Sequence, residues 1–166
     1  MKTIAELEKE LLEISSLMEQ EIMENNHDTP ETNTYNGTAN YEDFILEHGK
    51  TVIPLIQRMI QNNQIDNYAT TEMLTVSGQI HDPATYEERI DLLVYFLDSE
   101  RNHARLGAIK GLLELYPADK KVLMGVAKAV SSEAEPILQH LVEKLMDKLI
   151  QRHTRGIYEQ IIQKKQ

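Results

Sequence analysis

The chain has 166 residues and no cysteine, which excludes disulfide bonds, zinc–thiolate sites and cysteine nucleophiles. Hydrophobic residues make up 41% and charged residues 27% of the chain, a composition that is typical of a folded globular domain and argues against disorder over its whole length. The formal net charge of −10 disfavours nucleic-acid and anionic-lipid partners and favours a cationic one.

This charge is distributed unevenly along the chain. Residues 1–31 have a net charge of −7, residues 32–143 also −7, and residues 144–166 carry six basic and two acidic residues, a net +4. We interpret the basic residues as cations at helix C-termini, where they stabilise the helix dipole. A nucleic-acid surface would need stacking aromatic residues beside them. For the acidic body, solubility alone is the alternative explanation.

No segment of the sequence has the features of a signal peptide or a membrane span. Charged residues interrupt each short apolar run at the N-terminus. No stretch approaches the ~18 consecutive apolar residues that a membrane helix requires. We therefore expect a soluble, cytoplasmic, single-domain protein without a membrane partner.

Residues 1–25 are predicted to form a long N-terminal helix. Apolar residues recur there every three or four positions, as in an amphipathic helix, at Ile4, Leu7, Leu11, Ile14 and Met18. Thr3 followed by Glu6 has the spacing of a capping box, in which the side chain of each residue accepts a hydrogen bond from the backbone N–H of the other. The helix is therefore expected to start at Thr3.

Two shorter elements are predicted next. Residues 26–40 lack a hydrophobic period and are rich in Asn, Thr, Gly and Pro, so we expect a loop with its sharpest turn at Asn36-Gly37. Residues 41–49 are predicted to form a short helix that Gly49 ends.

An internal period of 34 residues begins at Lys50. Segments that start at Lys50, Ala84 and Ala118 align, with the polar turns Asn63-Gln64, Asp98-Ser99 and Ser131-Ser132 falling within a residue of one another. Each segment is predicted to be helix–turn–helix, so residues 50–151 form three hairpins, and a C-terminal helix follows at residues 152–166. Single hairpins cannot bury their apolar faces alone, and stacked neighbours share a core. We expect this core to include Leu93, Ile109, Leu112, Leu123 and Leu141.

The middle segment resembles a HEAT repeat. The matching residues of its second helix are Asp98, the pair Ala104-Arg105, the small residues Gly107 and Ala108, and Leu112 with Leu115. The other two segments match only in hydrophobic spacing, with Thr70-Thr71 and Leu138-Gln139 in place of the Ala-Arg pair. The resemblance implies an all-α fold: a short HEAT-like solenoid of stacked helical hairpins with a long N-terminal helix. Tetratricopeptide repeats share the period, but their Trp, Gly-Tyr and Ala-Phe positions are not met.

The sequence contains none of the common catalytic motifs, so we expect neither enzymatic activity nor a cofactor. GxxxxGK[ST], GxGxxG, GxSxG and HExxH are all absent. Two Glu-x-x-His patterns, Glu24 to His27 and Glu100 to His103, have the spacing of ligands in di-iron helical bundles. We interpret both as chance pairs on solvated surfaces and predict no metal site. A helical metal-dependent enzyme is the alternative.

The function predicted from these features is binding of a basic protein. Opposite charge would steer the association, and the sharper hypothesis is an inhibitor or immunity protein that neutralises a cationic nuclease toxin. A structural subunit of a larger assembly is a further alternative. Two acidic patches are candidates for partner binding: Glu6, Glu10 and Glu13 in the first helix, and Glu87, Asp91, Tyr95, Asp98 and Glu100 in the second hairpin. Tyr95 fits an aromatic anchor and a core residue equally well.

Overall fold

The computed structural model describes residues 1–25, 36–115 and 119–165, and all regular structure within these ranges is helical, which confirms the all-α class. The helices, in chain order, are α1 (Ile4–Asn25), α2 (Asn36–His48), α3 (Ile53–Gln61), α4 (Asn67–Gln79), α5 (Tyr86–Phe96), α6 (Asn102–Leu115), α7 (Lys120–Ser132) and α8 (Pro136–Lys165), with short 3-10 helices η1 (Gly49–Val52) and η2 (Pro83–Thr85).

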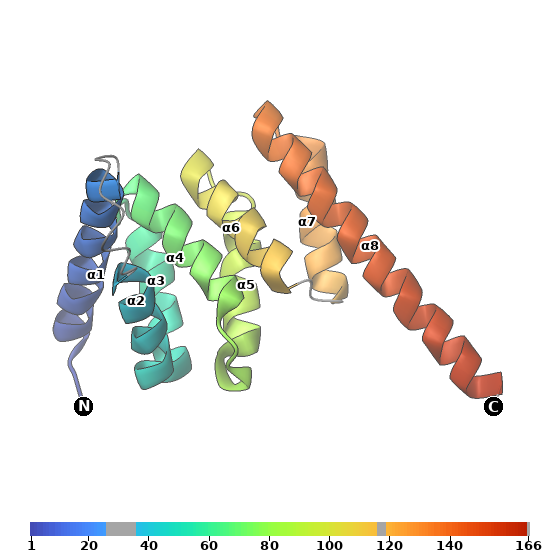
Figure 1. The fold of residues 1–166 in the computed structure, drawn as a ribbon, viewed down its shortest axis with the longest axis horizontal. Helices are drawn as coiled ribbons and strands as arrows, with labels where there is room; N and C mark the ends of the chain where they lie inside the picture. Colours follow the sequence, from blue (N-terminus) through green and yellow to red (C-terminus); the bar gives the residue numbers. More distant parts are fainter. Residues whose placement is uncertain (26–35, 116–118, 166) are drawn as a thin grey trace.

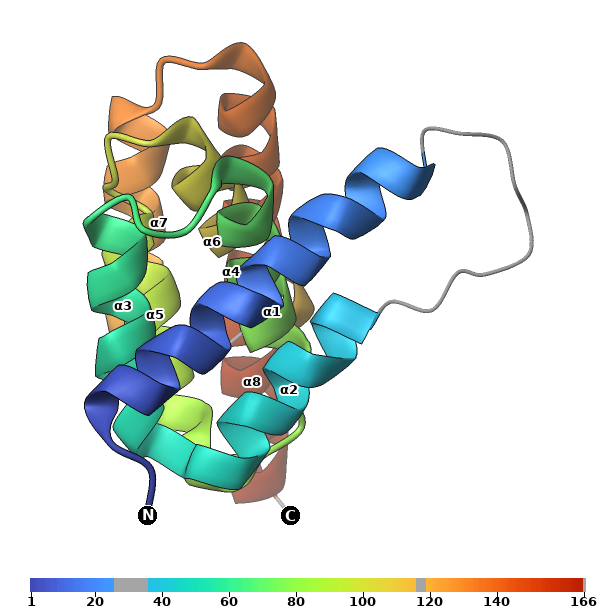
Figure 2. The same cartoon turned by 90° about the vertical axis from the view of Figure 1, so that its left-hand side faces the viewer.

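The helices form a row that starts at α1 and α2 and ends at α7 and α8 (Figure 1). Viewed from the α1 end, α3, α5 and α7 lie behind one another in one layer, and α4, α6 and α8 lie behind one another in a second (Figure 2). α1 runs diagonally across this end of the row. The N-terminal part of the chain and the end of α8 are therefore far apart.

One continuous apolar core runs between the layers. Leu93, Ile109 and Leu112 are buried, as predicted. Leu123 and Leu141, also predicted to be core residues, are only partly buried. The reason is their place in α7 and α8, which close the row and have a neighbouring helix pair on one side only.

The N-terminus of α1 has the predicted capping box. The backbone N–H of Thr3 donates to the Glu6 carboxylate (2.6 Å), and the backbone N–H of Glu6 donates to Thr3 Oγ1 (3.2 Å). Glu6 thereby stabilises the start of the helix, and these hydrogen bonds lower its pKa.

The prediction of a loop at residues 26–40 followed by a helix at residues 41–49 is wrong for residues 36–40, because α2 already begins at Asn36. The Gly37 N–H donates to Glu21 Oε1 of α1 (2.9 Å), and a Cβ at Gly37 would lie only 2.7 Å from Met18 Cγ. The glycine expected to make a turn instead lets the first turn of α2 pack directly on α1. Residues 26–35 lie outside the described residues.

The predicted boundary at residues 151–152 is also wrong, because α8 continues from Pro136 to Lys165 without a break. No proline follows Pro136, and the single glycine within the helix, Gly156, costs only about 1 kcal/mol relative to alanine. The backbone hydrogen bonds therefore continue through the segment expected to begin a new helix. The turn before α8 lies at residues 133–135, whereas the predicted turn residues Ser131 and Ser132 end α7.

α1 and α2 are both fixed to α4 by buried or partly buried hydrogen bonds. The Ala69 N–H at the start of α4 donates to Glu19 Oε1 of α1 (2.9 Å). The Tyr41 hydroxyl of α2 is hydrogen-bonded to Ser77 Oγ of α4 (2.9 Å), and burial raises the pKa of Tyr41 above its ordinary value. The hydrogen bonds to α4 therefore fix the position of α1 relative to α2.

Arg105, from the HEAT-like Ala-Arg pair, forms a bidentate ion pair with Glu133 in the α7–α8 turn. Arg105 Nε lies 2.7 Å from Glu133 Oε2, and Nη2 lies 3.1 Å from Oε1. Burial by itself raises the pKa of Glu133, but the hydrogen bonds from Arg105 and from the Glu135 N–H outweigh it, so the pKa is lowered. The ion pair connects α6 to the last helix pair.

We expect Glu133→Gln to lower the free energy of unfolding by about 2 kcal/mol at neutral pH, because the charge-assisted hydrogen bonds are lost. Since the pKa of Glu133 is lower in the folded state, its stabilisation is present above the unfolded-state value of about 4.3 and is lost as pH falls through the folded-state value. Urea denaturation of both proteins at a series of pH values checks this. If the difference in free energy of unfolding between the two proteins stayed constant down to the lowest pH measured, this prediction would be contradicted.

Candidate functional site

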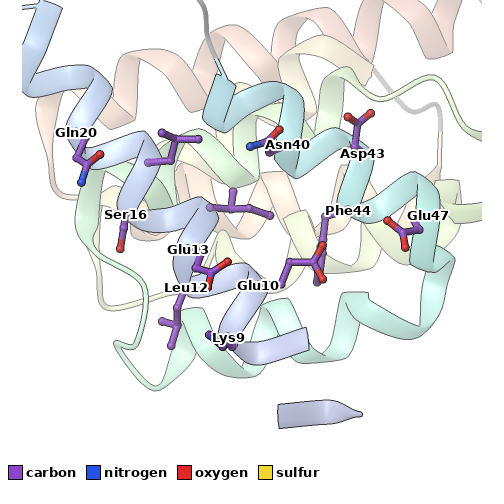
Figure 3. A pocket seen from close by; sticks show the side chains of 12 residues that line it. Lys9, Glu10, Leu12, Glu13, Ser16, Gln20, Asn40, Asp43, Phe44 and Glu47 are labelled. Carbon is purple, nitrogen blue, oxygen red and sulfur yellow. The ribbon is translucent and has the colours of Figure 1, made fainter. Parts of the chain in front are cut away.

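An open groove with a volume of about 630 Å³ lies between α1 and α2 (Figure 3). Its α1 wall and its α2 wall each present residues three or four positions apart, which lie on one face of a helix. The lining residues are Lys9, Glu10, Leu12, Glu13, Ile14, Ser16, Leu17, Gln20, Asn40, Asp43, Phe44 and Glu47.

The groove combines an apolar floor with an acidic rim. Ile14 and Phe44 are buried at its base, and Leu12 is exposed at its edge. Carboxylates stand on both walls, at Glu10 and Glu13 of α1 and at Asp43 and Glu47 of α2 (Figure 3). Among the described residues that line the groove, only Lys9 is basic. Such a surface attracts cations at its rim and accepts apolar side chains at its centre.

Four charged or titratable side chains meet at one end of this groove. Lys2 Nζ lies 2.8 Å from Glu10 Oε2 and 3.9 Å from Glu47 Oε1, and the hydrogen bond to Glu10 raises the pKa of Lys2. His48 Nε2 lies 3.7 Å from Glu10 Oε2 and 3.8 Å from Glu47 Oε1. Glu10, Glu47 and His48 are close enough to ligate one divalent cation, but the Lys2 ammonium would first have to leave Glu10.

Of the first predicted patch, the structure places Glu10 and Glu13 in the groove, whereas Glu6 lies outside it and caps α1. Asp43, Glu47 and His48 were not predicted. Asp43 and Glu47 occupy positions i and i+4 of the helix predicted at residues 41–49, so the sequence already placed them on one face. The contact between that face and α1 could not be predicted from the sequence.

The second predicted patch, on α5 and the turn after it, is exposed but partly neutralised. Asp91 is paired with Lys121 of α7, and Asp98 is paired with Lys128 of α7 at 3.0 Å. Glu87 and Glu100 are also exposed. These lysines cancel part of the negative charge on which the prediction depended.

Tyr95 is a surface residue and not a core residue, because its side chain is 43% exposed. It lines a second, smaller cavity of about 460 Å³ together with Asp98 and Glu100. The cavity brings these three predicted residues together, whereas Glu87 and Asp91 are not part of its lining.

Among the described residues of the two Glu-x-x-His patterns, the structure shows no shared cluster of metal ligands. Glu24 is exposed near the end of α1, and His27 lies outside the described residues. Glu100 precedes α6 and His103 is exposed in its first turn. Across the described ranges, the trio of possible metal ligands at Glu10, Glu47 and His48 contains none of these residues.

None of the helices in the described part of the chain combines the length and the apolar character needed to cross a bilayer.

Comparisons with protein families, with curated proteins and with solved structures give no match to this chain. The HEAT-like resemblance and the immunity-protein hypothesis therefore stay predictions.

Proposed function

We propose that this protein is a protein-binding module that recognises a basic partner through the acidic groove between α1 and α2. The observation that carries the proposal is the juxtaposition of four carboxylates, at Glu10, Glu13, Asp43 and Glu47, around an apolar floor. A basic amphipathic helix fits this chemistry, since its apolar side chains enter the groove and its cations meet the rim. In this proposal the remaining helix pairs form a HEAT-like array that supports the groove.

The groove is a better candidate than the α5 patch because its carboxylates stand on two facing helices around an apolar floor that includes Ile14 and Phe44. In the α5 patch, Asp91 of α5 and Asp98 of the following turn already form ion pairs with lysines of α7. In the groove, the Lys2 ammonium is shared at one end between Glu10 and Glu47. Glu13 and Asp43 line the remainder of the groove and are both exposed.

The sharper form of the proposal is an inhibitor or immunity protein for a nuclease toxin. A nuclease presents a cationic surface to its substrate, so an acidic groove that covers that surface would block substrate access. Charge complementarity would also raise the association rate, as in other inhibitor complexes of this electrostatic type.

The binding proposal is tested with a fluorescein-labelled helical peptide made of leucine and lysine at amphipathic spacing, measured by fluorescence anisotropy. We expect Glu13→Lys/Asp43→Lys to weaken binding at least about tenfold, which corresponds to about 1.4 kcal/mol. Asp91→Lys/Glu100→Lys changes the net charge equally and is the matched control, for which a much smaller effect is expected. A peptide with glutamate in place of lysine should not bind.

Equal losses in the two variants would show general charge attraction without a groove site, and a larger loss in the control would assign binding to α5. The nuclease form needs a further measurement: a basic protein captured from native lysate by the wild type, and not by the groove variant, should cleave nucleic acid until an equimolar amount of this protein is added. A captured partner without nuclease activity would contradict that form alone.

A further inference from the structure

The C-terminal half of α8 presents an apolar stripe that no part of the described chain covers. The helix packs on the body through Leu138, Val142, Leu145 and Leu149, and beyond Leu149 no described side chain is buried. Figure 1 shows this half extending away from α6 and α7 at the end of the row. Ile150, Ile157 and Ile161 are 47%, 47% and 49% exposed.

These three isoleucines share one face of the helix. Their spacing of seven and four residues, with Thr154 between the first two, follows the period of a helical seam. The body-facing residues Leu149 and Leu145 lie on a different face, about 100° and about 140° around the helix axis from Ile150. The stripe is therefore accessible while α8 remains packed on its own body.

The same segment is basic. Residues 150–165 carry four basic residues and one acidic residue, a net charge of +3. Lys164 and Lys165 form the last turn, and Arg155 pairs with Glu159 at 3.1 Å. The segment continues α8 beyond the part that packs on the body, so it extends an existing helix and needs no nucleation of its own.

The groove between α1 and α2 has the complementary chemistry, with an apolar floor and carboxylates on both walls. It lies at the opposite end of the row from the tip of α8 (Figure 1), so a helix cannot reach the groove of its own chain. It can reach the groove of another molecule. The positively charged α8 segments of two molecules, by contrast, repel each other.

We propose that residues 150–165 of one copy dock in the α1–α2 groove of a second copy, with Ile150, Ile157 and Ile161 on the apolar floor and the cations at the rim. This inference rests on the proposed function, since it names a second copy of the chain as an occupant of the same groove. The contact is head-to-tail, so it generates an open chain or a closed ring. It also places self-association in competition with any other basic partner.

Two full-length variants test the inference by sedimentation velocity in low-salt buffer. The groove variant is Glu13→Lys/Asp43→Lys, and the helix variant is Ile157→Asp/Ile161→Asp. All four side chains are exposed, and circular dichroism checks that each variant keeps its fold. We expect the wild type to form species larger than a dimer with rising concentration and to dissociate at high salt. Each variant alone should be monomeric, and an equimolar mixture should form a heterodimer and no larger species.

Several outcomes would overturn the inference. A groove variant that still self-associates would show that α8 pairs with α8, and a mixture without heterodimer would exclude the head-to-tail contact. A wild type that is monomeric at its highest soluble concentration would also overturn it. So would a monomer that cosediments with phosphatidylglycerol vesicles through the isoleucine stripe.

The failure of this inference is distinguishable from that of the proposed function. A wild type that stays monomeric yet binds the leucine–lysine peptide through the groove refutes self-association alone. Peptide binding that ignores Glu13→Lys/Asp43→Lys refutes the groove as a binding site.

Discussion

Replacing Gly78 with alanine is expected to lower the free energy of unfolding by about 3 kcal/mol or more. Gly78 lies in the last turn of α4, where that helix crosses α6 at Gly111. A Cβ at this position would overlap the Gly111 carbonyl oxygen and lie 2.5 Å from Gly111 Cα. Both atoms belong to the backbone, so the overlap is relieved only if the two helices separate. Urea denaturation followed by circular dichroism measures the loss.

Gly156→Ala is the matched control, because no described atom outside the adjoining stretch of its own helix lies within 4 Å of a Cβ built at Gly156. There the higher helix propensity of alanine acts alone, and we expect no loss and a gain of at most about 1 kcal/mol. The same propensity favours Gly78→Ala, so any destabilisation there comes from packing. A loss of less than about 0.5 kcal/mol for Gly78→Ala would mean that α4 and α6 do not approach closely at this point.

Replacing Arg89 with alanine is the second change with a large expected effect, a loss of about 3 to 5 kcal/mol. Arg89 is only 1% exposed, and its guanidinium donates to Ser77 O (2.7 Å), Asp82 O (2.9 Å) and Thr85 Oγ1 (2.9 Å). Burial lowers the pKa of Arg89, which shows the cost of removing the charge from water. Alanine would leave three buried or partly buried acceptors without this donor and a cavity beside them.

Two further variants locate the origin of this loss. Arg89→Lys keeps the charge but cannot direct separate N–H groups at three acceptors, so an intermediate loss is expected. Arg58→Ala removes an exposed arginine that pairs with Glu8, and its effect should stay below about 1 kcal/mol. Chemical denaturation of the three variants under one condition gives the comparison. Equal losses for Arg89→Ala and Arg58→Ala would contradict the role assigned to the buried network.

Local sequence patterns predicted the features of the fold that depend on neighbouring residues. The three- and four-residue apolar spacing of α1 predicts a helix because residues so separated share a face. The capping box of Thr3 and Glu6 was predictable for the same reason, since its hydrogen bonds span three residues. Gly107, one of the small residues of the HEAT-like match, lies where α6 approaches α4 closely: a Cβ there would lie 2.8 Å from Thr71 O.

Features that depend on distant residues were not predictable. Asn36-Gly37 has the composition of a turn, and only its contact with Met18 and Glu21 makes it the start of α2. The carboxylates of Asp91 and Asp98 appeared available in the sequence because their lysine partners lie 30 residues later, in α7.

The candidate site also combines residues that the sequence predicted with residues that it did not. Glu10 and Glu13 were predicted from the polar face of a single helix. Asp43 and Glu47 complete the groove only because α2 packs beside α1, through contacts such as Gly37 with Glu21. A pattern within one helix cannot specify which other helix its polar face will meet, so the opposite wall was missed.

The row of helices also gives the molecule a large permanent electric dipole moment along its long axis. Residues 1–25, at one end of the row, carry seven acidic and two basic residues, whereas the tip of α8 at the other end is net positive (Figure 1). The centres of negative and positive charge are therefore displaced from each other. In dilute salt the protein should align in an applied field and show strong electric birefringence. That signal should fade as the Debye length shortens to about 10 Å at 0.1 M salt.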